Sequence, residues 1–472
     1  MTARWVIGHE EGCHVVYENG VVVLEGTRVL HVGATFTGEV TQRIDYGQAI
    51  ISPGFIDLDA LSDLDTTILG YDNGPAWKKG RVWPDTYVAR GPYEMYAPEE
   101  LAFQKRHAFA QLIRNGITTA LPIASLFYRA WGETVAEFEA AAQAAQELGL
   151  RVYLGPAYRS GGQITDAAGN IRAVFDEARG LEGLEQAADF ARRIDGVAGG
   201  LVRAMFAPDR IETCTQALLQ RTAHIASDIG APVRQHCSQS PTEVRLVREQ
   251  HACAPIEWLD RIGALRANWL LPHGTEATEA EFDLIATAGA TLVHCPLVSA
   301  RHGGMLKSFP KCRAKGINIG LGTDTHPADM ILNMQIGMMT ARLTDGMDAV
   351  SSAQMFDAAT LGGAQALNRN DLGRLAPGAK ADIAVIDLRY SLQTPDPVQT
   401  LMTSSSGRDV RDVWIDGRHV MKDGTIPGVD EGGDAARAQT QFDRLVAKYP
   451  DRTAGHPPVS EIFTPSYRRA AP

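Results

Sequence analysis

The chain has 472 residues, of which 44% are hydrophobic and 21% are charged, and its formal net charge at pH 7 is −11. This composition is typical of a soluble globular protein large enough for one barrel and a smaller domain, and it excludes a disordered or fibrous chain. The acidic balance argues against nucleic acid or an anionic membrane as a partner, because both select basic patches.

The chain carries no signal of export or membrane insertion. Its first twenty residues contain no apolar core of signal-peptide length, and no later stretch approaches the roughly 18 apolar residues of a membrane span. Six widely spaced cysteines without a C-x-x-C pair favour reduced, mostly buried thiols over disulfides or a zinc ribbon. We therefore expect a cytoplasmic protein.

Short β-type runs occupy both ends of the chain. The first fifty residues contain "HVVYENGVVVLEG", "RVLHVGA" and "AIISPGFID", and "KADIAVIDL" and "VRDVWIDGRHVMKDG" follow near the other end. Asn19-Gly20, Asp416-Gly417 and Asp423-Gly424 are typical of hairpin turns. The two sets of strands flank the rest of the chain.

Between these ends, apolar strands alternate with amphipathic helices. Helical stretches that end at Gly116 and Gly149 are followed by "ITTALPIA" and "LRVYLGPA", and the later strands are "APVRQHC", "NWLLPHG", "ATLVHCP" and "INIGLGTD". About eight such units predict an α/β fold with a TIM-type (β/α)8 barrel. A doubly wound open sheet is the alternative, but no glycine-rich nucleotide fingerprint and no Walker-type loop occurs.

The domain organisation follows from these patterns. We expect a small β-domain whose first part is residues 1–56, a barrel over 57–368, the second part of the β-domain over 369–425, and a C-terminal helical extension over 426–472.

Polar residues collect at the carboxyl ends of the predicted strands, where a barrel of this kind builds its site. They are Asp57, Asp59, Asp63, His236, His273, His294 and Asp324. One histidine at a strand end is more often a hydrogen-bonded structural group than a ligand. Several histidines and carboxylates at one barrel mouth indicate a divalent metal site, because imidazole and carboxylate are ligands that such a metal takes.

Motifs in a fixed order carry a resemblance over nearly all of residues 1–425. They are "ISPGFID", "RNGITTA", "FAPDRIETCT", "HCSQSPTEV", "LLPHG", "LVHCP" and "GLGTD". Together they resemble the amidohydrolase superfamily, in the branch of chlorohydrolases and deaminases that act on triazines, cytosine and related compounds. The resemblance implies a metal-dependent hydrolase with a small β-sandwich domain built from both chain ends.

The ligand set implied by this resemblance is altered at the first strand. The family holds its metal with His-x-His on the first strand, a His on the fifth and an Asp on the eighth. His236 and Asp324 match, whereas Asp59 and Leu61 occupy the two histidine positions. With this change, the resemblance implies one divalent transition metal held by Asp59, His236, His273 and Asp324, with zinc first and manganese or cobalt also admissible.

The resemblance also implies catalytic roles. Metal-bound hydroxide would attack the carbonyl or amidine carbon of an amide-, urea-, carbamate- or amidine-like small molecule, and the C–N or C–S bond to the leaving group would break. Asp324 is expected to take the water proton, and His273 or His294 to polarise the carbonyl oxygen or protonate the leaving group, although their roles stay open. An altered first-strand motif is also similar to that of hydrolases of phenylurea and thiocarbamate herbicides such as molinate.

Four further residues are expected to bind substrate. Gln239 occupies the position of the fifth-strand Glu, and a neutral amide can orient a substrate but cannot act as a base. Asp209 occupies the position of the family's substrate-facing His. Trp77 belongs to an aromatic loop that forms a pocket wall or merely packs on the barrel rim, and His326 reaches substrate or belongs to a surface helix cap.

Two hypotheses follow from the altered motif. Either the chain is a metal-dependent hydrolase with a rebuilt site, or it is a catalytically inactive barrel that serves in binding or assembly. If the chain had lost its metal, random substitution would give no reason for the polar strand-end residues to remain, and these are His236, His273, His294 and Asp324. We therefore favour the metal-dependent hydrolase. We expect a small-molecule substrate and a homo-oligomer.

Overall fold

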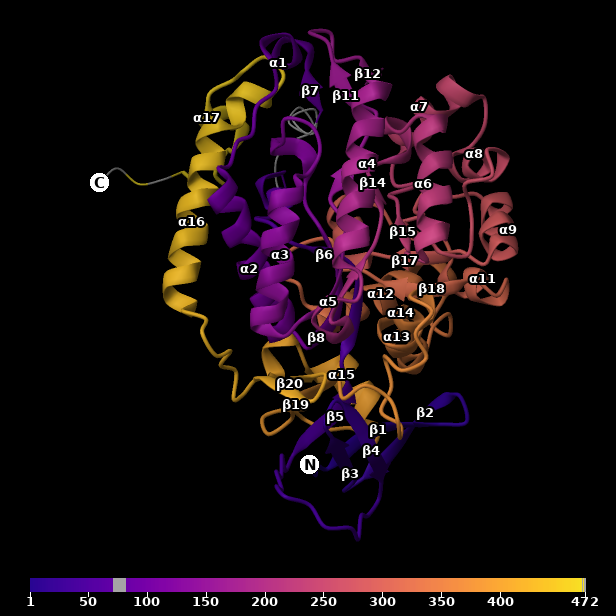
Figure 1. Ribbon diagram of the computed structural model, residues 1–472, viewed down its shortest axis with the longest axis vertical. Coiled ribbons are helices and arrows are strands. Elements are labelled where there is room, and N and C mark those ends of the chain that lie inside the picture. Colours follow the sequence, from indigo (N-terminus) through magenta and orange to yellow (C-terminus); the bar gives the residue numbers. More distant parts are fainter. Residues whose placement is uncertain (71–81, 469, 471–472) are drawn as a thin grey trace.

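The computed structural model describes residues 1–70, 82–468 and 470. Figure 1 shows a barrel surrounded by helices, with a smaller β-domain at one end in which strands from the start and the end of the chain lie together. Among the described helices, none is both long enough and apolar enough to cross a bilayer.

Eight strands form the barrel as two parallel sheets, ordered β13-β9-β8-β6 and β15-β16-β17-β18. A parallel bridge between Phe206 and Val233 joins the sheets on one side, and β18 lies beside β6 on the other. The bounds are β6 (Phe55–Leu61), β8 (Ile117–Ile123), β9 (Arg151–Leu154), β13 (Val202–Ala204), β15 (Val233–Arg234), β16 (Trp269–Pro272), β17 (Thr291–His294) and β18 (Asn318–Leu321). Almost all of these residues are buried, as in parallel sheets covered on both faces, and the predicted barrel is confirmed.

Several helices around the barrel begin at a side-chain cap and end at a glycine. In α3 (Val135–Leu148), for example, the Thr134 hydroxyl accepts the N–H of Glu137, and Gly149 ends the helix with a φ of 82°. The remaining helices are α1 (Asp85–Arg90), α2 (Pro98–Arg114), α4 (Glu177–Ile194), α5 (Val197–Gly200), α6 (Gln216–Ile229), α7 (Pro241–His251), α8 (Pro255–Arg261), α9 (Glu279–Ala288), α10 (Pro296–Arg301), α11 (Phe309–Ala314), α12 (Met330–Asp345), α13 (Ser352–Ala359), α14 (Leu361–Ala366), α15 (Pro397–Ser404), α16 (Glu431–Lys448) and α17 (Val459–Ile462).

The β-domain draws strands from both chain ends, as the sequence predicts. Its six-stranded sheet has the order β2-β1-β5-β19-β20-β21, and β3 pairs with β4 in a separate hairpin. The bounds are β1 (Trp5–Glu10), β2 (Cys13–Glu18), β3 (Val21–Glu25), β4 (Arg28–Gly33), β5 (Ala49–Pro53), β19 (Ile383–Asp387), β20 (Val410–Ile415) and β21 (Arg418–Met421). Asp416 and Gly417 both have positive φ and join β20 to β21, which confirms that predicted turn. The fold is therefore an α/β barrel with a β-sandwich, and the exact domain boundaries stay a prediction.

Short strands stand at the barrel rim, and a helix closes the chain. The rim strands are β7 (Trp83–Pro84), β10 (Ala157–Tyr158), β11 (Gly161–Thr165), β12 (Ile171–Phe175) and β14 (Ala207–Pro208). The helix α16 lies along α2, where the Gln104 amide donates to Gln441 at 3.0 Å (Figure 1). The predicted C-terminal helix is confirmed, and all six cysteines are free, with only Cys13 exposed.

Candidate metal centre

Four of the predicted ligands meet at the carboxyl ends of four strands. Asp59 lies in β6, His236 and His273 follow β15 and β16, and Asp324 follows β18. Each residue offers a nitrogen or oxygen atom, and these atoms all lie within 4.8 Å of one another. The parallel strands of the barrel are the reason for this convergence, because they carry all their carboxyl ends to one mouth.

Two close pairs make up the cluster. His236 Nε2 lies 3.4 Å from Asp59 Oδ2, and His273 Nε2 lies 3.6 Å from Asp324 Oδ2. The rings of His236 and His273 stack with their centroids 5.3 Å apart. Asp59 and His273 are buried, whereas His236 and Asp324 also form part of the cavity wall described below.

The first and last strands lock together beside this cluster. The Asp57 carboxylate accepts the Thr323 N–H at 3.0 Å and the Thr323 hydroxyl at 2.6 Å. The Asp324 N–H donates to the main-chain carbonyl of Asp59 at 2.8 Å. The positions of Asp59 and Asp324 are therefore set by the main chain of β6 and of the turn after β18.

The cluster offers lone pairs and negative charge that suit a divalent cation. Asp59 Oδ1 and both ring nitrogens of His273 are buried and make no hydrogen bond to any described residue. Burial, and then the carboxylates of Asp59 and Asp65, raise the pKa of Asp324 well above its usual value. Two imidazoles and two carboxylates form a donor set that zinc, manganese and cobalt accept, so the residues fit such a metal.

The surroundings lower the pKa values of two further members of the cluster, for different reasons. Burial, and then the neighbouring His236, lower the pKa of His273 well below its usual value. Burial alone would raise the pKa of Asp59, but the positive charges of His236 and Arg234 outweigh it and hold that pKa below its usual value. His273 is therefore a neutral imidazole and Asp59 a carboxylate, the forms in which both bind metals.

A cavity of about 610 Å³ opens above the cluster. Its lining includes Trp83, Arg159, Gln163, Asp209 and Gln239. Asp209 Oδ2 lies 3.8 Å from Arg159 Nη1, and the Arg159 guanidinium lies over the Trp83 ring at 4.8 Å. Gln239 Oε1 is buried without a hydrogen-bond partner among the described residues.

The carboxylates of Asp63 and Asp65, which follow β6, do not belong to the cluster. Asp63 accepts the Ser125 N–H at 2.7 Å and the hydroxyl of Tyr128. Asp65 accepts the Thr325 hydroxyl at 2.6 Å. Both carboxylates therefore stabilise the loop that follows the first strand, and burial raises the pKa of Asp63 well above its usual value.

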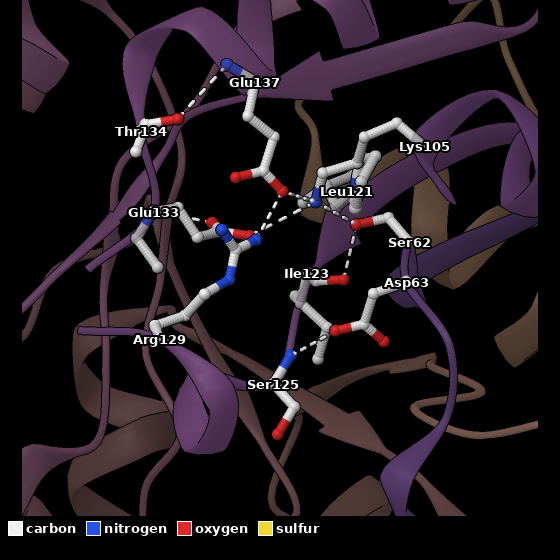
Figure 2. Close-up of polar contacts among 12 residues, drawn as sticks. Ser62, Asp63, Lys105, Leu121, Ile123, Ser125, Arg129, Glu133, Thr134 and Glu137 are labelled. Carbon is white, nitrogen blue, oxygen red and sulfur yellow. Dashed lines mark hydrogen bonds and ion pairs between the residues drawn. The ribbon is translucent and has the colours of Figure 1, made fainter. Parts of the chain in front are cut away.

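A buried charge network anchors that loop (Figure 2). Lys105 Nζ donates to Ser62 Oγ at 2.7 Å and lies 3.2 Å from Glu133 and 3.1 Å from Glu137. Arg129 pairs with Glu137 at 2.5 Å. Since at most 2% of each charged side chain is exposed, the two cations and two carboxylates neutralise one another inside the protein and tie the loop to α2 and α3.

Two other predicted residues, His294 and His326, lie outside the cluster and the lining of the cavity. His294 ends β17, and its ring lies 6.0 Å from that of Phe309, outside both the four-residue cluster and the lining of the cavity. Val293 and Cys295 face the barrel interior, so the alternation along the strand turns His294 toward the surrounding helices. The His326 N–H donates to Asp65 at 2.9 Å, and Trp77 lies outside the described residues.

The structure also reveals arginines that we did not predict from the sequence. Arg234 Nε lies 3.4 Å from Asp59 Oδ1, and Arg159 and Arg210 line the cavity. A signal for Arg234 exists, since it lies two positions before His236 and side chains two apart in a strand share a face. No comparable signal distinguishes Arg159 or Arg210, because both lie in loops.

Comparisons with known proteins identify the family of the chain. The family model described as the amidohydrolase family matches residues 50–420. A 5-methylthioadenosine/S-adenosylhomocysteine deaminase of Natronomonas pharaonis is 27% identical over 434 residues, which cover 90% of this chain and 93% of the relative. The resemblance to the branch of chlorohydrolases and deaminases is thereby supported, whereas nearness to phenylurea and thiocarbamate hydrolases stays a prediction.

Solved structures share the fold. An adenosine deaminase from Xanthomonas campestris with bound zinc matches with a TM-score of 0.77 at 21% identity, over 94% of this chain and 97% of its own. The atrazine chlorohydrolase TrzN from Arthrobacter aurescens, complexed with zinc, matches with a TM-score of 0.76 at 18% identity, over 93% and 99% of the two chains. The solved structures show the fold alone, whereas the family model covers most of the sequence. The chain therefore belongs to the amidohydrolase family, as an enzyme of the type that acts on carbon–nitrogen bonds.

Proposed function

We propose that the protein holds one divalent transition metal, zinc first, with Asp59, His236, His273 and Asp324, and hydrolyses an amidine-like C–N bond of a small molecule. The observation that carries this proposal is the convergence of four ligand atoms within 4.8 Å at the barrel mouth. A metal of this kind supplies a Lewis acid that lowers the pKa of a bound water to about 7.

The residues of the chain divide the remaining work. Asp324 is the proposed base, because it belongs to both the ligand cluster and the cavity wall. His273 Nε2 lies 3.6 Å from its carboxylate, so the proposed base lies directly beside a proposed ligand of the metal. Gln239 lines the same cavity and is proposed to orient the substrate, because an amide donates and accepts hydrogen bonds without taking a proton.

The cavity limits the substrate class. Its volume of about 610 Å³ lies within the range of small-molecule sites. Arg159 Nε and Nη2 are buried without hydrogen-bond partners among the described residues, so a polar or anionic substituent is proposed to bind there. The relatives named as deaminases favour an amidine-like carbon, such as that bearing the amino group of an adenine ring, over the urea, carbamate and thiocarbamate carbons that the sequence also admits.

Metal content tests the first half of the proposal. The protein is purified without chelator or added metal, and bound metals are measured per chain by elemental analysis. About one transition metal per chain is expected, and the variant His236→Ala should lose it. The variant His224→Ala is the control, because His224 is an exposed histidine on α6 whose side chain is 75% exposed. No metal in the wild type, even after growth with zinc, manganese or cobalt, would refute the proposal.

Ammonia release tests the second half. The metal-loaded protein is incubated with 5-methylthioadenosine, S-adenosylhomocysteine, adenosine and guanine, and with a matched set of amides, ureas and carbamates. Ammonia from at least one amidine-like substrate is expected, with none from His236→Ala. Turnover of ureas or carbamates alone would move the substrate class to the other carbons that the sequence admits. The cytoplasmic location and the homo-oligomeric state stay predictions.

A further inference from the structure

Arg234 is a permanent cation in the barrel for which the proposed function has no use. It ends β15, two positions before His236, and its side chain is 3% exposed. A guanidinium stays charged in proteins, whereas a buried lysine or histidine can give up its proton. A fixed positive charge therefore lies beside a centre that is proposed to bind a second, divalent cation.

The two oxygens of Asp59 face different side chains. Oδ1 lies 3.4 Å from Arg234 Nε, and Oδ2 lies 3.4 Å from His236 Nε2, on the side of the proposed ligands. Arg234 Nη1 donates to the main-chain carbonyls of Leu121 and Pro122 at 3.1 and 3.0 Å. These bonds to β8 anchor the guanidinium, so it cannot swing away when a metal binds.

Asp59 does not need Arg234 to hold its position. The contact between Oδ1 and Nε lacks hydrogen-bond geometry, since both atoms are without a hydrogen-bond partner among the described residues. The main chain of Asp59 is fixed instead by its N–H, which donates to Asp57 Oδ1 at 3.2 Å, and by its carbonyl, which accepts the Asp324 N–H at 2.8 Å. Arg234 therefore acts on Asp59 through charge rather than through placement.

We propose that Arg234 is an internal counter-ion of Asp59 that lowers the affinity of the centre for its divalent metal. Asp59 and Asp324 would offer two negative charges, and the guanidinium leaves only one for the metal. Because the side chains of Arg234 and Asp59 are buried, water and salt screen the repulsion between the guanidinium and the metal less than they would at the surface. This inference rests on the proposed function, because it concerns the same metal centre.

The test is the affinity for zinc and cobalt, measured by competition with a chromogenic chelator on the metal-free full-length protein. In Arg234→Gln the charge is removed while an amide can still donate to a carbonyl of β8. We expect this variant to bind both metals at least tenfold more tightly than the wild type. Arg234→Lys keeps the charge and should bind within about threefold of the wild type. Arg234→Met is the second neutral variant, in case the glutamine variant does not fold, and circular dichroism checks the folding of each.

The outcomes separate this inference from the proposed function. Unchanged or weaker metal binding in a folded neutral variant overturns the inference, and weaker binding makes Arg234 a positioning residue of Asp59. Equal tightening in Arg234→Lys also overturns it, because the charge would then not be the cause. If the wild-type protein binds no metal, or if His236→Ala binds as much metal as the wild type, the proposed function is refuted instead.

Discussion

Replacing Lys105 by methionine should destabilise the fold strongly without touching the proposed metal ligands. Lys105 Nζ lies 3.2 Å from Glu133 and 3.1 Å from Glu137, and its side chain is 1% exposed. At these separations Coulomb's law with an effective dielectric constant of about 20 gives roughly 5 kcal/mol for each contact, most of which the desolvation of the charges offsets. Removing one partner leaves a buried carboxylate uncompensated, and such a change costs about 3–5 kcal/mol.

Urea-induced unfolding, followed by circular dichroism and tryptophan fluorescence, measures this loss. The double variant Lys105→Met/Glu133→Gln restores charge balance, so it should be more stable than Lys105→Met alone by at least about 1 kcal/mol. The coupling distinguishes lost charge balance from lost packing of the lysine stem. A loss below about 1 kcal/mol in Lys105→Met, or strictly additive effects in the double variant, would refute the reasoning.

Three further predictions follow from the site and from burial. Asp324→Asn should lower the rate of ammonia release at least 100-fold and leave the circular dichroism spectrum unchanged. A rate of ammonia release near that of the wild type would reject Asp324 as the base. Arg159→Met should raise KM about tenfold for an anionic substrate at a nearly unchanged kcat, and an unchanged KM would reject its role in binding. Burial lowers the pKa of His14 to about 4, so between pH 6.5 and 4 the unfolded chain binds a proton that the folded chain does not. The free energy of unfolding therefore decreases as the pH is lowered through this range. When the pH is lowered from about 7.5 to 5, the free energy of unfolding measured in urea should decrease by about 2 kcal/mol less for His14→Gln than for the wild type. An equal decrease in both proteins would contradict the lowered pKa of His14.

Much of the site could be predicted because a parallel barrel converts order along the chain into proximity. The apolar strands and amphipathic helices are local patterns, and their alternation requires parallel strands with all carboxyl ends at one mouth. Asp59, His236, His273 and Asp324 each lie at such an end, so the sequence places them at one mouth once the strands are identified, and the structure brings their ligand atoms within 4.8 Å of one another. The β-domain is predictable for the same reason, since its strands and turns are local signals at both chain ends.

The direction of each side chain at a strand end is less accessible to the sequence. His294 has the same pattern of neighbours as His273, yet it lies on the outer side of β17 near Phe309. In a strand of four residues a shift of one position turns every side chain to the other face, and no local pattern fixes that choice. The packing of the finished barrel decides it.

The sequence by itself thus determined the fold class, the two-ended β-domain and the polar residues at the strand ends, because each depends on periodicity and on strand order. The choice of four ligands among those residues came from the family resemblance. Only the tertiary structure decided which charges are buried together. Lys105 reads in "FQKRHAF" as an ordinary helix residue, and Arg234 reads as one polar residue in a strand. Their partners Glu133 and Asp59 lie 28 and 175 positions away in the chain, and a contact of that kind depends on the folded geometry of several elements at once.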